Sequence, residues 1–398
     1  MRRVLIVHSN MELGGAETSL LGLLYALKTT NCEVDLMLMQ HSGELMQLLP
    51  EHVKLLPENK HYRAMMLPIK TALLGGEFGV AAARLTAKAV CAIRKRKLGF
   101  TTMGYIVKQR SHCYAVKVLP KIEGEYDLAI SFIDPHYILT KKANARCRVG
   151  WFHTDFSRIV SDPQLEDGMW RECDAIVNVS DECKRAFDAS HPTLTDRSIV
   201  IENILAKEFV HHRSREDVSA EMPRDGSIRL LSIGRFTAQK NFDNVPYICR
   251  HLRQMGLNVK WYLIGYGGDE ELIRRSIAEA GMEEHVILLG KKANPYPYIA
   301  ACDLYVQPSR YEGKAVTVRE AQMLGKPVVI TRYATSASQL TEDFDGVIVP
   351  MDNEGCAAGI AALLRDPAKM QTLSENCRRG DYANTRQAQK LMELLGED

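Results

Sequence analysis

Residues 303–321 read DLYVQPSRYEGKAVTVREA in one-letter code and contain a structural pattern that recurs along the whole chain. Leu304–Val306 is a short apolar run typical of a buried strand, and Val316–Met323 has the periodicity of a helix. The residues between them join the end of the strand to the start of the helix. Near-continuously apolar strands that alternate with helices are typical of parallel sheets covered on both faces.

The same alternation extends in both directions, with helical periodicity at Glu17–Leu27 and Asp269–Ala280. The predicted strands of the first half are Val4–Val7, Val34–Met39, Val53–Leu56, Leu128–Phe132, Arg148–Phe152 and Ala175–Val179. Those of the second half are Ile228–Ile233, Val259–Ile264, Val286–Leu289, Leu304–Val306, Val328–Ile330 and Val347–Val349. These twelve strands are too many for one comfortable open sheet. The pattern therefore predicts an α/β protein with two doubly wound, Rossmann-like domains.

The polar stretch 207–227 separates the two groups of strands and is the expected linker. We place the N-terminal domain at residues 1–205 and the C-terminal domain at residues 206–380. The sequence has no short-period repeat. The only internal similarity that we expect is between the two α/β domains.

Composition excludes several classes of protein. The chain has 398 residues, with 51 Lys and Arg against 49 Asp and Glu, a net charge of +2. Apolar residues make up 46% and charged residues 25%, which is typical of a globular protein and excludes disordered, coiled-coil and collagen-like chains. The near-zero charge argues against a nucleic-acid partner. The ten cysteines form no CxxC pair and are expected to be reduced thiols without a metal.

No membrane span is expected from the sequence. Apolar runs such as Leu20–Leu27 are too short to cross a bilayer. Arg2 and Arg3 before Val4–Val7 imitate the start of a signal peptide, but this apolar run ends at His8 and is interpreted as the first strand. The expected location is therefore the cytoplasm.

One segment departs from the overall charge balance. Residues 78–122 contain no Asp or Glu and ten Lys or Arg, four of them at Arg94–Lys97. Apolar residues are interspersed with these cations. A basic amphipathic helix is typical of surfaces that bind anionic lipid. A solvated helix face is the alternative interpretation of the same pattern.

Three loops carry candidate chemistry. The first, His8–Glu17, contains Gly14 and Gly15 between the first strand and its helix, where backbone N–H groups can meet an anion. It is neither a GxGxxG fingerprint nor a P-loop, and a simple turn would look the same. The second, Ser232–Asn241, carries Arg235 and Lys240 directly after a strand. The planar donors of Arg235 and the compact charge of Lys240 can together hold a diphosphate. Two solvated cations at the end of a strand would give the same sequence pattern.

The third loop is the one in residues 303–321. Glu312 lies in the loop and Glu320 follows it by eight positions, inside the helix. Lys314, Ala315 and Val316 lie near the helix start, where N–H groups are free for a phosphate. The two carboxylates can accept hydrogen bonds from sugar hydroxyls.

These motifs together resemble glycosyltransferase family 4, whose members are retaining, nucleotide-sugar-dependent enzymes of the GT-B fold. The resemblance covers nearly the whole chain and rests on the Gly14-Gly15 loop, the Arg235–Lys240 segment and the Glu312–Glu320 element. Further matching segments are Asn203, Ile264–Gly267, Val286–Gly290 and Asp303–Ser309. It implies two domains that face a central cleft, and a helix in residues 381–398 that packs back toward the N-terminal domain.

The resemblance also implies roles for the donor site. Arg235 and Lys240 would bind the diphosphate and stabilise the leaving nucleotide. Glu320 would bind the ribose, and Glu312 would bind hydroxyls of the transferred sugar, together with main-chain N–H groups of Lys314, Ala315 and Val316. Gly14 and Gly15 would contribute from the N-terminal domain. His153, at the end of a strand, matches the family's histidine near the reacting carbon.

The implied mechanism is same-face attack, in which the leaving phosphate helps to deprotonate the acceptor. Arg235 and Lys240 would replace a metal ion, so neither a metal nor a cofactor is expected. The chain departs from the family pattern at Lys314, where an apolar residue is usual, and at Ala334–Leu340, which replaces a glycine pair and an acid.

The expected donor is a UDP-hexose or UDP-N-acetylhexosamine, with GDP-, ADP- and dTDP-sugars as alternatives. The expected acceptor is a glycan or lipid-linked glycan of bacterial surface polysaccharide synthesis. The segment 78–122 would then dock the enzyme as a peripheral protein on the inner face of the membrane. The alternatives are a GT-B-fold hydrolase or nucleotide-sugar epimerase, and a non-catalytic nucleotide-sugar-binding subunit. A nicotinamide dehydrogenase is excluded by the missing glycine fingerprint.

Overall fold

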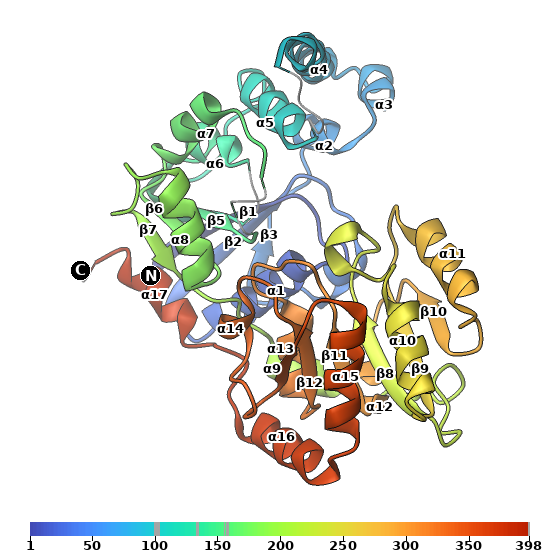
Figure 1. Ribbon diagram of the computed structural model, residues 1–398. Coiled ribbons are helices and arrows are strands. Elements are labelled where there is room, and N and C mark those ends of the chain that lie inside the picture. The colour runs from blue at the N-terminus through green and yellow to red at the C-terminus, as the bar shows by residue number, and fades with distance from the viewer. Residues whose placement is uncertain (99–103, 133–134, 155, 157–158, 397–398) are drawn as a thin grey trace. The chain divides into compact units, whose positions relative to one another are not determined.

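The computed structural model describes residues 1–98, 104–132, 135–154, 156 and 159–396, and its side-chain detail leaves out residues 94–98 and 208. The chain divides into two compact units (Figure 1). The first comprises Met1–Ile204 and Thr385–Asp398, and the second comprises Leu205–Asn384. The division lies one residue before the predicted boundary at residue 205, and the C-terminal residues return to the first unit.

The first unit is built on a parallel seven-stranded sheet in the order β3-β2-β1-β4-β5-β6-β7. Its strands are β1 (Arg2–His8), β2 (Cys32–Leu38), β3 (Val53–Leu55), β4 (Tyr126–Ser131), β5 (Ala145–Phe152), β6 (Ala175–Asn178) and β7 (Ser198–Val200). Its helices are α1 (Gly15–Leu27), η1 (Glu44–Leu48), α2 (Lys60–Met66), α3 (Ile69–Leu74), α4 (Phe78–Leu98), α5 (Gly104–Ala115), α6 (Tyr137–Lys142), α7 (Pro163–Trp170), α8 (Asp181–Ser190) and α17 (Gln387–Glu393). Every strand predicted in this half is confirmed. Strand β7 was missed because its three residues include only two apolar ones.

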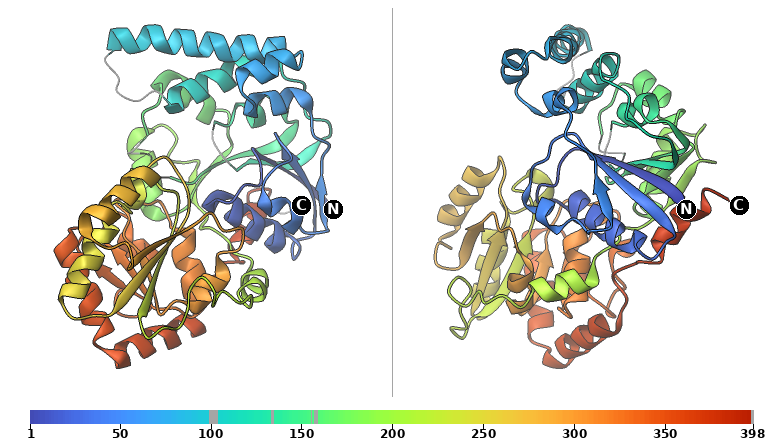
Figure 2. Two further views of the ribbon diagram at one scale, coloured as in Figure 1. Left: turned by 90° about the vertical axis from the view of Figure 1, so that its right-hand side faces the viewer. Right: turned by 180° about the vertical axis from the view of Figure 1, so that it is seen from behind.

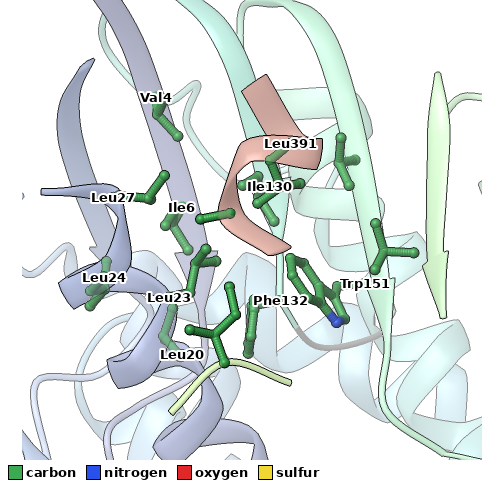
Figure 3. Close-up of a cluster of buried hydrophobic side chains, with 14 of the residues drawn as sticks. Val4, Ile6, Leu20, Leu23, Leu24, Leu27, Ile130, Phe132, Trp151 and Leu391 are labelled. Carbon is green, nitrogen blue, oxygen red and sulfur yellow. The ribbon is translucent and has the colours of Figure 1, made fainter. Parts of the chain in front are cut away.

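One face of this sheet packs against α1 and α17 (Figure 3). Alternate strand residues reach this face, including Val4, Ile6, Ile130 and Trp151. The helices contribute Leu20, Leu23, Leu24 and Leu27 from α1 and Leu391 from α17. Leu391 is fully buried, so the last helix of the chain is part of the core of the first unit.

The opposite face carries Leu5, Val7, Met37 and Met39, which pack against residues of α2, α3, α4 and α6. Helices α2 to α5 gather on one side of the unit, at the top of Figure 1. Helix α4 runs beside α5, as the blue and teal helices of Figure 2 show. The acid-free segment 78–122 therefore forms a helical layer, of which residues 99–103 lie outside the described residues.

Helix α4 exposes apolar side chains. Phe78 is 67%, Leu85 is 49% and Ile93 is 59% exposed, whereas Ala87 and Cys91 are buried. Up to Ile93, α4 therefore exposes apolar side chains alongside the cation Lys88.

Two cations of the segment turn inward. Nη1 of Arg84 donates to the carbonyl oxygens of Ala64 at 2.6 Å and Leu67 at 2.5 Å. Arg110 is buried and forms an ion pair with Asp162. These two side chains are thus used inside the fold. The side chains of the densest cluster, Arg94–Lys97, lie outside the described part of the chain.

The second unit contains a parallel six-stranded sheet in the order β10-β9-β8-β11-β12-β13. Its strands are β8 (Ile228–Ile233), β9 (Val259–Ile264), β10 (Val286–Gly290), β11 (Leu304–Gln307), β12 (Val328–Thr331) and β13 (Val347–Val349). Its helices are α9 (Lys207–Arg213), η3 (Ala238–Lys240), α10 (Val245–Gln254), α11 (Glu270–Ala280), α12 (Tyr296–Ala301), α13 (Val316–Met323), α14 (Ser336–Gln339), α15 (Asn353–Leu364) and α16 (Pro367–Arg379). All the strands predicted in this half are confirmed.

The two faces of this sheet bury separate cores. Leu231 and Tyr305 face the core that includes residues of α9, α12 and α13. Leu230 and Leu304 face the core that includes residues of α10, α11 and α15. Each strand is thus apolar on both faces, which explains the continuous apolar runs of the sequence.

The polar stretch 207–227 is not a free linker. It begins with α9, and Val210 and Met222 are buried in the core of the second unit, with Phe209 and Val218 packed against it. The sequence pattern did not indicate this, because the buried apolar residues are widely spaced among polar ones.

Within the part of the chain that the structure describes, no helix has both the length and the apolar character needed to cross a membrane.

Candidate functional site

The carboxyl ends of β8 and β11 are the place in the second sheet where a ligand site is expected. The two strands are hydrogen-bonded neighbours, with Leu304 opposite Leu230. From this pair the strand order continues as β9-β10 on one side and as β12-β13 on the other. Loops that leave such a reversal diverge, and α/β proteins bind ligands there. The second and third sequence motifs are the loops that follow these two strands.

The loop after β8 directs Lys240 across Gly234. A Cβ atom at Gly234 would lie 3.0 Å from Cδ and Cε of Lys240, so glycine leaves room for the lysine side chain. The next residue, Asn241, has a left-handed backbone with φ of 61°, which asparagine tolerates better than most residues. Its Nδ2 donates to the carbonyl oxygen of Pro308 at 2.9 Å. This bond joins the β8 loop to the β11 loop.

Glu312 is the centre of a hydrogen-bond network. Lys240 Nζ lies 2.6 Å from Glu312 Oε1, and Ser309 Oγ donates to the same oxygen at 2.5 Å. Gln239 Nε2 donates to Glu312 Oε2 at 3.1 Å, and Gln307 Nε2 donates to Ser309 Oγ at 2.8 Å. Glu312 is only 6% exposed, so its charge requires these donors. The carboxylate is fixed in position at the end of β11.

Arg235 contrasts with its neighbours. Its side chain is exposed, and its guanidinium has no hydrogen bond or ion pair with any residue that the structure describes. Arg310 in the facing loop is instead held by Asp243, at 3.0 Å and 2.7 Å. Arg235 is therefore available for an anion, whereas Arg310 holds the two loops together.

Glu320 lies in the second turn of α13 and is 3% exposed. Tyr296 of α12 donates a hydrogen bond from its hydroxyl to Glu320 Oε1 at 3.1 Å. Burial raises the pKa of Glu320 to about 7, although the hydrogen bond from Tyr296 opposes this shift. Near neutral pH this carboxyl group can therefore exist in both protonation states.

The start of α13 differs from the expectation of free N–H groups. The N–H of Ala315 donates to Gln339 Oε1 at 2.6 Å, and Gln339 Nε2 donates back to the Ala315 carbonyl at 3.2 Å. The prediction that this N–H is free is therefore wrong, because Gln339 occupies it. Lys314 is 7% exposed and donates to the carbonyl of Ser338, so it does not point outward. Val316 is buried as the first residue of α13.

The first unit has its own polar cluster at a reversal of strand order, where β1 and β4 are neighbours. His8 ends β1, and its Nε2 lies 3.4 Å from Oε1 of Glu17 in α1. Burial alone would raise the pKa of Glu17, but the hydrogen bond to His8 and the charges of His8 and His153 lower it overall. Glu17 is thus ionised near neutral pH.

His153 follows β5, with its ring centroid 4.6 Å from that of Phe132 and 6.0 Å from that of Trp151, to which it is parallel within 7°. Its interaction with Glu17 joins it to the same cluster. Asp155, two residues after His153, lies outside the described residues.

Gly14 caps α1, and Gly15 begins the helix. A Cβ atom at Gly14 would lie 2.2 Å from Oε2 of Glu17. The Glu17 carboxylate therefore occupies the space beside Gly14. It lies at the N-terminus of α1, where a negative charge is favoured.

Several residues of the network were missed from the sequence. Gln307 ends β11 and Ser309 lies two positions later, both shortly before Glu312 in the sequence, and Gln239 directly precedes Lys240. Their nearness in sequence to predicted site residues was therefore a usable signal. Thr335, whose hydroxyl donates to the Glu312 carbonyl at 2.8 Å, is distant in sequence and gave no such signal.

Comparison with protein families finds that residues 214–380, within the second unit, match the family described as glycosyl transferases group 1. One relative is an N-acetylgalactosamine-N,N'-diacetylbacillosaminyl-diphospho-undecaprenol 4-alpha-N-acetylgalactosaminyltransferase of Campylobacter jejuni. It is 28% identical over 169 residues, which are 42% of this chain and 44% of the relative. The amylovoran biosynthesis glycosyltransferase AmsK of Erwinia amylovora is 30% identical over 145 residues, 34% of this chain and 35% of the relative. The matched stretches thus span less than half of these relatives.

Solved structures match over both units. Anabaena Alr3699/HepE in complex with UDP-glucose has a TM-score of 0.67 at 16% identity and covers 99% of both chains. A mutant of S. aureus TarM, in complex with Fondaparinux, alpha-GlcNAc-glycerol and UDP, has a TM-score of 0.70 at 13% identity and covers 100% of both chains. The chain therefore has the GT-B fold, and residues 214–380 of its second unit match the glycosyl transferases group 1 family.

Proposed function

We propose that this protein is a retaining glycosyltransferase that transfers a hexosyl unit from a UDP-sugar to a glycan or lipid-linked glycan. The observation that carries the proposal is the contact between Lys240 and Glu312 at the reversal of strand order in a glycosyl transferases group 1 domain. A cation for phosphate and a carboxylate for hydroxyls are thus side by side, as a sugar diphosphate requires.

The donor is recognised in the second unit. Arg235, with its exposed guanidinium, and Lys240 bind the diphosphate and stabilise the charge that develops as the nucleotide leaves. Glu312 accepts hydrogen bonds from the transferred sugar, and Glu320 binds the ribose. Main-chain N–H groups at the start of α13, at Lys314 to Val316, complete this side of the site, and the Ala315 N–H does so after release from Gln339.

The transfer follows same-face attack. The bond between the anomeric carbon and the leaving phosphate oxygen breaks, and the acceptor oxygen bonds to the same face of that carbon. The acceptor proton passes to the leaving phosphate, and UDP departs. His153 contacts the sugar near the reacting carbon, and the Gly14-Gly15 loop contributes from the first unit. Because two cations stabilise the diphosphate, we propose that no metal or cofactor is required, and activity should survive dialysis against EDTA.

The donor class and pathway are supported by the relatives. The Anabaena structure is a complex with UDP-glucose, and the Campylobacter relative is named as acting on a diphospho-undecaprenol glycan. Another relative is a lipopolysaccharide core biosynthesis glycosyltransferase, LpsD of Rhizobium meliloti. We therefore propose a UDP-hexose or UDP-N-acetylhexosamine as donor, and an acceptor of bacterial surface polysaccharide synthesis.

A lipid-linked acceptor places the reaction at a membrane, so we propose that the cytoplasmic protein docks peripherally on the inner face through residues 78–122. Phe78, Leu85 and Ile93 expose apolar surface on α4, directly before the basic residues 94–97. Apolar side chains next to cations suit the interface of an anionic bilayer.

The membrane part is tested by co-sedimentation with anionic vesicles. Reversal of Arg94, Lys95, Arg96 and Lys97 to Glu should abolish binding, and so should Phe78→Asp with Leu85→Asp. Reversal of Lys260, a half-buried cation of the second unit paired with Asp225, is the control and should leave binding intact. Vesicle binding that survives both sets of changes would remove the membrane part of the proposal.

The enzymatic part is tested by a thermal-shift screen with nucleotides and nucleotide sugars, followed by incubation of the donor that binds. A transferase should form product only when acceptor is added. NMR of the product should show the same anomeric configuration as in the donor. Conversion of the donor without acceptor would favour the hydrolase or epimerase alternative. Unchanged cellular glycan synthesis in Glu312→Ala and Lys240→Ala strains would favour a non-catalytic binding subunit.

A further inference from the structure

The loop after β12 contains a buried hydroxyl group that the proposed donor contacts do not use. Tyr333 is 3% exposed, and its hydroxyl oxygen is buried without a hydrogen-bond partner in the described parts of the chain. An unsatisfied buried hydroxyl is costly, so such a group calls for an explanation.

Tyr333 packs in the same core as Tyr305, and Glu312 of the proposed donor site is close enough to influence it electrostatically. Burial first, and then the neighbouring Glu312 carboxylate and Tyr305, raise the pKa of Tyr333 well above its ordinary value. The hydroxyl is therefore protonated near neutral pH and can both donate and accept a hydrogen bond. It lies within the electrostatic reach of the carboxylate that is proposed to bind the transferred sugar.

Side chains lock the β12 loop onto the β11 loop. Thr335 Oγ1 donates to the Glu312 carbonyl at 2.8 Å, and Gln339 makes two hydrogen bonds with Ala315. Lys314 donates to the carbonyl of Ser338. The segment Ala334–Leu340, which departs from the family pattern, is thus held against Glu312 by side chains, and Tyr333 is the residue that precedes it.

The order of strands gives the direction of the ligand. At the carboxyl edge of the sheet β8, β11 and β12 are consecutive neighbours. Arg235 and Lys240 follow β8, Glu312 follows β11 and Tyr333 follows β12. A ligand with its diphosphate at the β8 loop and its sugar at Glu312 would extend toward the β12 loop. A neutral hydroxyl there suits a sugar hydroxyl better than a phosphate, which favours cations.

We propose that the Tyr333 hydroxyl hydrogen-bonds a hydroxyl of the transferred sugar and so contributes to the choice of donor sugar. This inference rests on the proposed function, because it adds a contact to the same nucleotide-sugar site. The ligand satisfies the buried hydroxyl, and the site gains a partner that the glycine-pair loop of the family pattern would not supply.

The test compares the affinities of UDP and of UDP-sugars for Tyr333→Phe by isothermal titration calorimetry. The probes are UDP, UDP-glucose, UDP-galactose and UDP-N-acetylgalactosamine. Tyr382→Phe is the matched control, because Tyr382 packs against the same core but its hydroxyl donates to Asp345 at 3.0 Å. Thermal denaturation of both variants reports on folding.

We expect Tyr333→Phe to bind UDP as the wild type does and to bind the preferred UDP-sugar about tenfold more weakly. It should unfold at the wild-type temperature or above, since it loses an unsatisfied hydroxyl. Tyr382→Phe should unfold earlier and keep the wild-type ratio of affinities.

Three outcomes would overturn the inference and leave the proposed function intact. An unchanged affinity of Tyr333→Phe for both UDP and the preferred UDP-sugar would mean that the hydroxyl does not touch the sugar. An equal loss for UDP would assign it to the diphosphate. A wild type that binds UDP and all three UDP-sugars equally would show no sugar contact to explain. A wild type that binds no nucleotide at all would instead refute the proposed function and the inference with it.

Discussion

Lys240 Nζ lies 2.6 Å from Glu312 Oε1, so the cation and the carboxylate proposed for opposite ends of the sugar diphosphate are bonded to each other. Glu312 keeps donors from Ser309 and Gln239 when the lysine turns away. A diphosphate can therefore compete for Lys240 without leaving the buried carboxylate unsatisfied. When the donor binds, Lys240 therefore exchanges Glu312 for the diphosphate.

This exchange predicts that Glu312→Ala does not weaken binding of UDP, because Lys240 is released for the phosphate. The same variant should bind a UDP-sugar no better than UDP, since the sugar loses its carboxylate. Calorimetric titration with both ligands checks the prediction. Asp225→Ala is the control, because it breaks the ion pair with Lys260 at the amino ends of β8 and β9, whereas the loops follow the carboxyl ends of their strands. A Glu312→Ala variant that retains the wild-type preference for the UDP-sugar would contradict the assigned role.

Arg235 should be important for ligand binding and unimportant for stability. Arg235→Ala should weaken UDP binding by about tenfold or more, because a charge-assisted hydrogen bond to the diphosphate is lost. Its unfolding temperature should not change, since the guanidinium is bonded to no described residue. Arg310→Ala is the matched control and should unfold earlier, because Arg310 joins the two loops through Asp243. Loss of stability in Arg235→Ala would show that the side chain has a structural role.

Glu320 should make stability depend on pH. Burial raises its pKa from 4.5 to about 7 in the folded protein. Below pH 4.5 the carboxyl group is protonated in both the folded and unfolded states. As the pH rises toward 7, the unfolded state ionises first, and the folded state loses stability. Glu320→Gln lacks this group. The difference in free energy of unfolding between the variant and the wild type should therefore shift in favour of the variant by on the order of 3 kcal/mol from pH 4.5 to pH 8.

Urea unfolding of both proteins across this pH range measures the difference directly. A parallel pH dependence of the two proteins would show that Glu320 is ionised throughout in the folded state.

Gly14 and Glu17 should not act independently. A methyl group at Gly14 would displace the Glu17 carboxylate, from which it would be 2.2 Å away, and break its contact with His8. Gly14→Ala should therefore lower the free energy of unfolding by about 1 kcal/mol. The double variant with Glu17→Ala should be no less stable than Glu17→Ala alone. Additive losses in urea unfolding would mean that the glycine is needed for another reason.

The strands and the order of the motifs could be predicted from the sequence because they depend on local composition. Strands buried on both faces are continuous apolar runs, as at Val259–Ile264. Two consequences of tertiary packing could not be read in this way. The stretch 207–227 looks like a linker, but Val210 and Met222 anchor it in a core. Strand β7 is too short to leave a pattern.

The candidate site was predicted as a set of separate side chains. The sequence indicates Lys240 and Glu312 from loops that follow strands, and Glu320 from its place in the next helix, but not which partners each one has. Gln339 follows Ala315 by 24 positions and still takes its N–H, because β12 is the neighbour of β11. Arg84 looks like a surface cation in the sequence and binds two main-chain carbonyls in the structure. Contacts of this kind depend on strand order and on helix packing, which local patterns do not specify.

The loops after β8 and β11 are proposed to bind a nucleoside diphosphate sugar through Lys240. Isothermal titration calorimetry of UDP into the wild type and into Lys240→Ala tests it most directly. We expect saturable binding to the wild type and an affinity at least about tenfold lower for Lys240→Ala, because a charged phosphate contact is lost. Equal affinities for the two proteins, or no binding of UDP or of any other nucleoside diphosphate to the wild type, would contradict it.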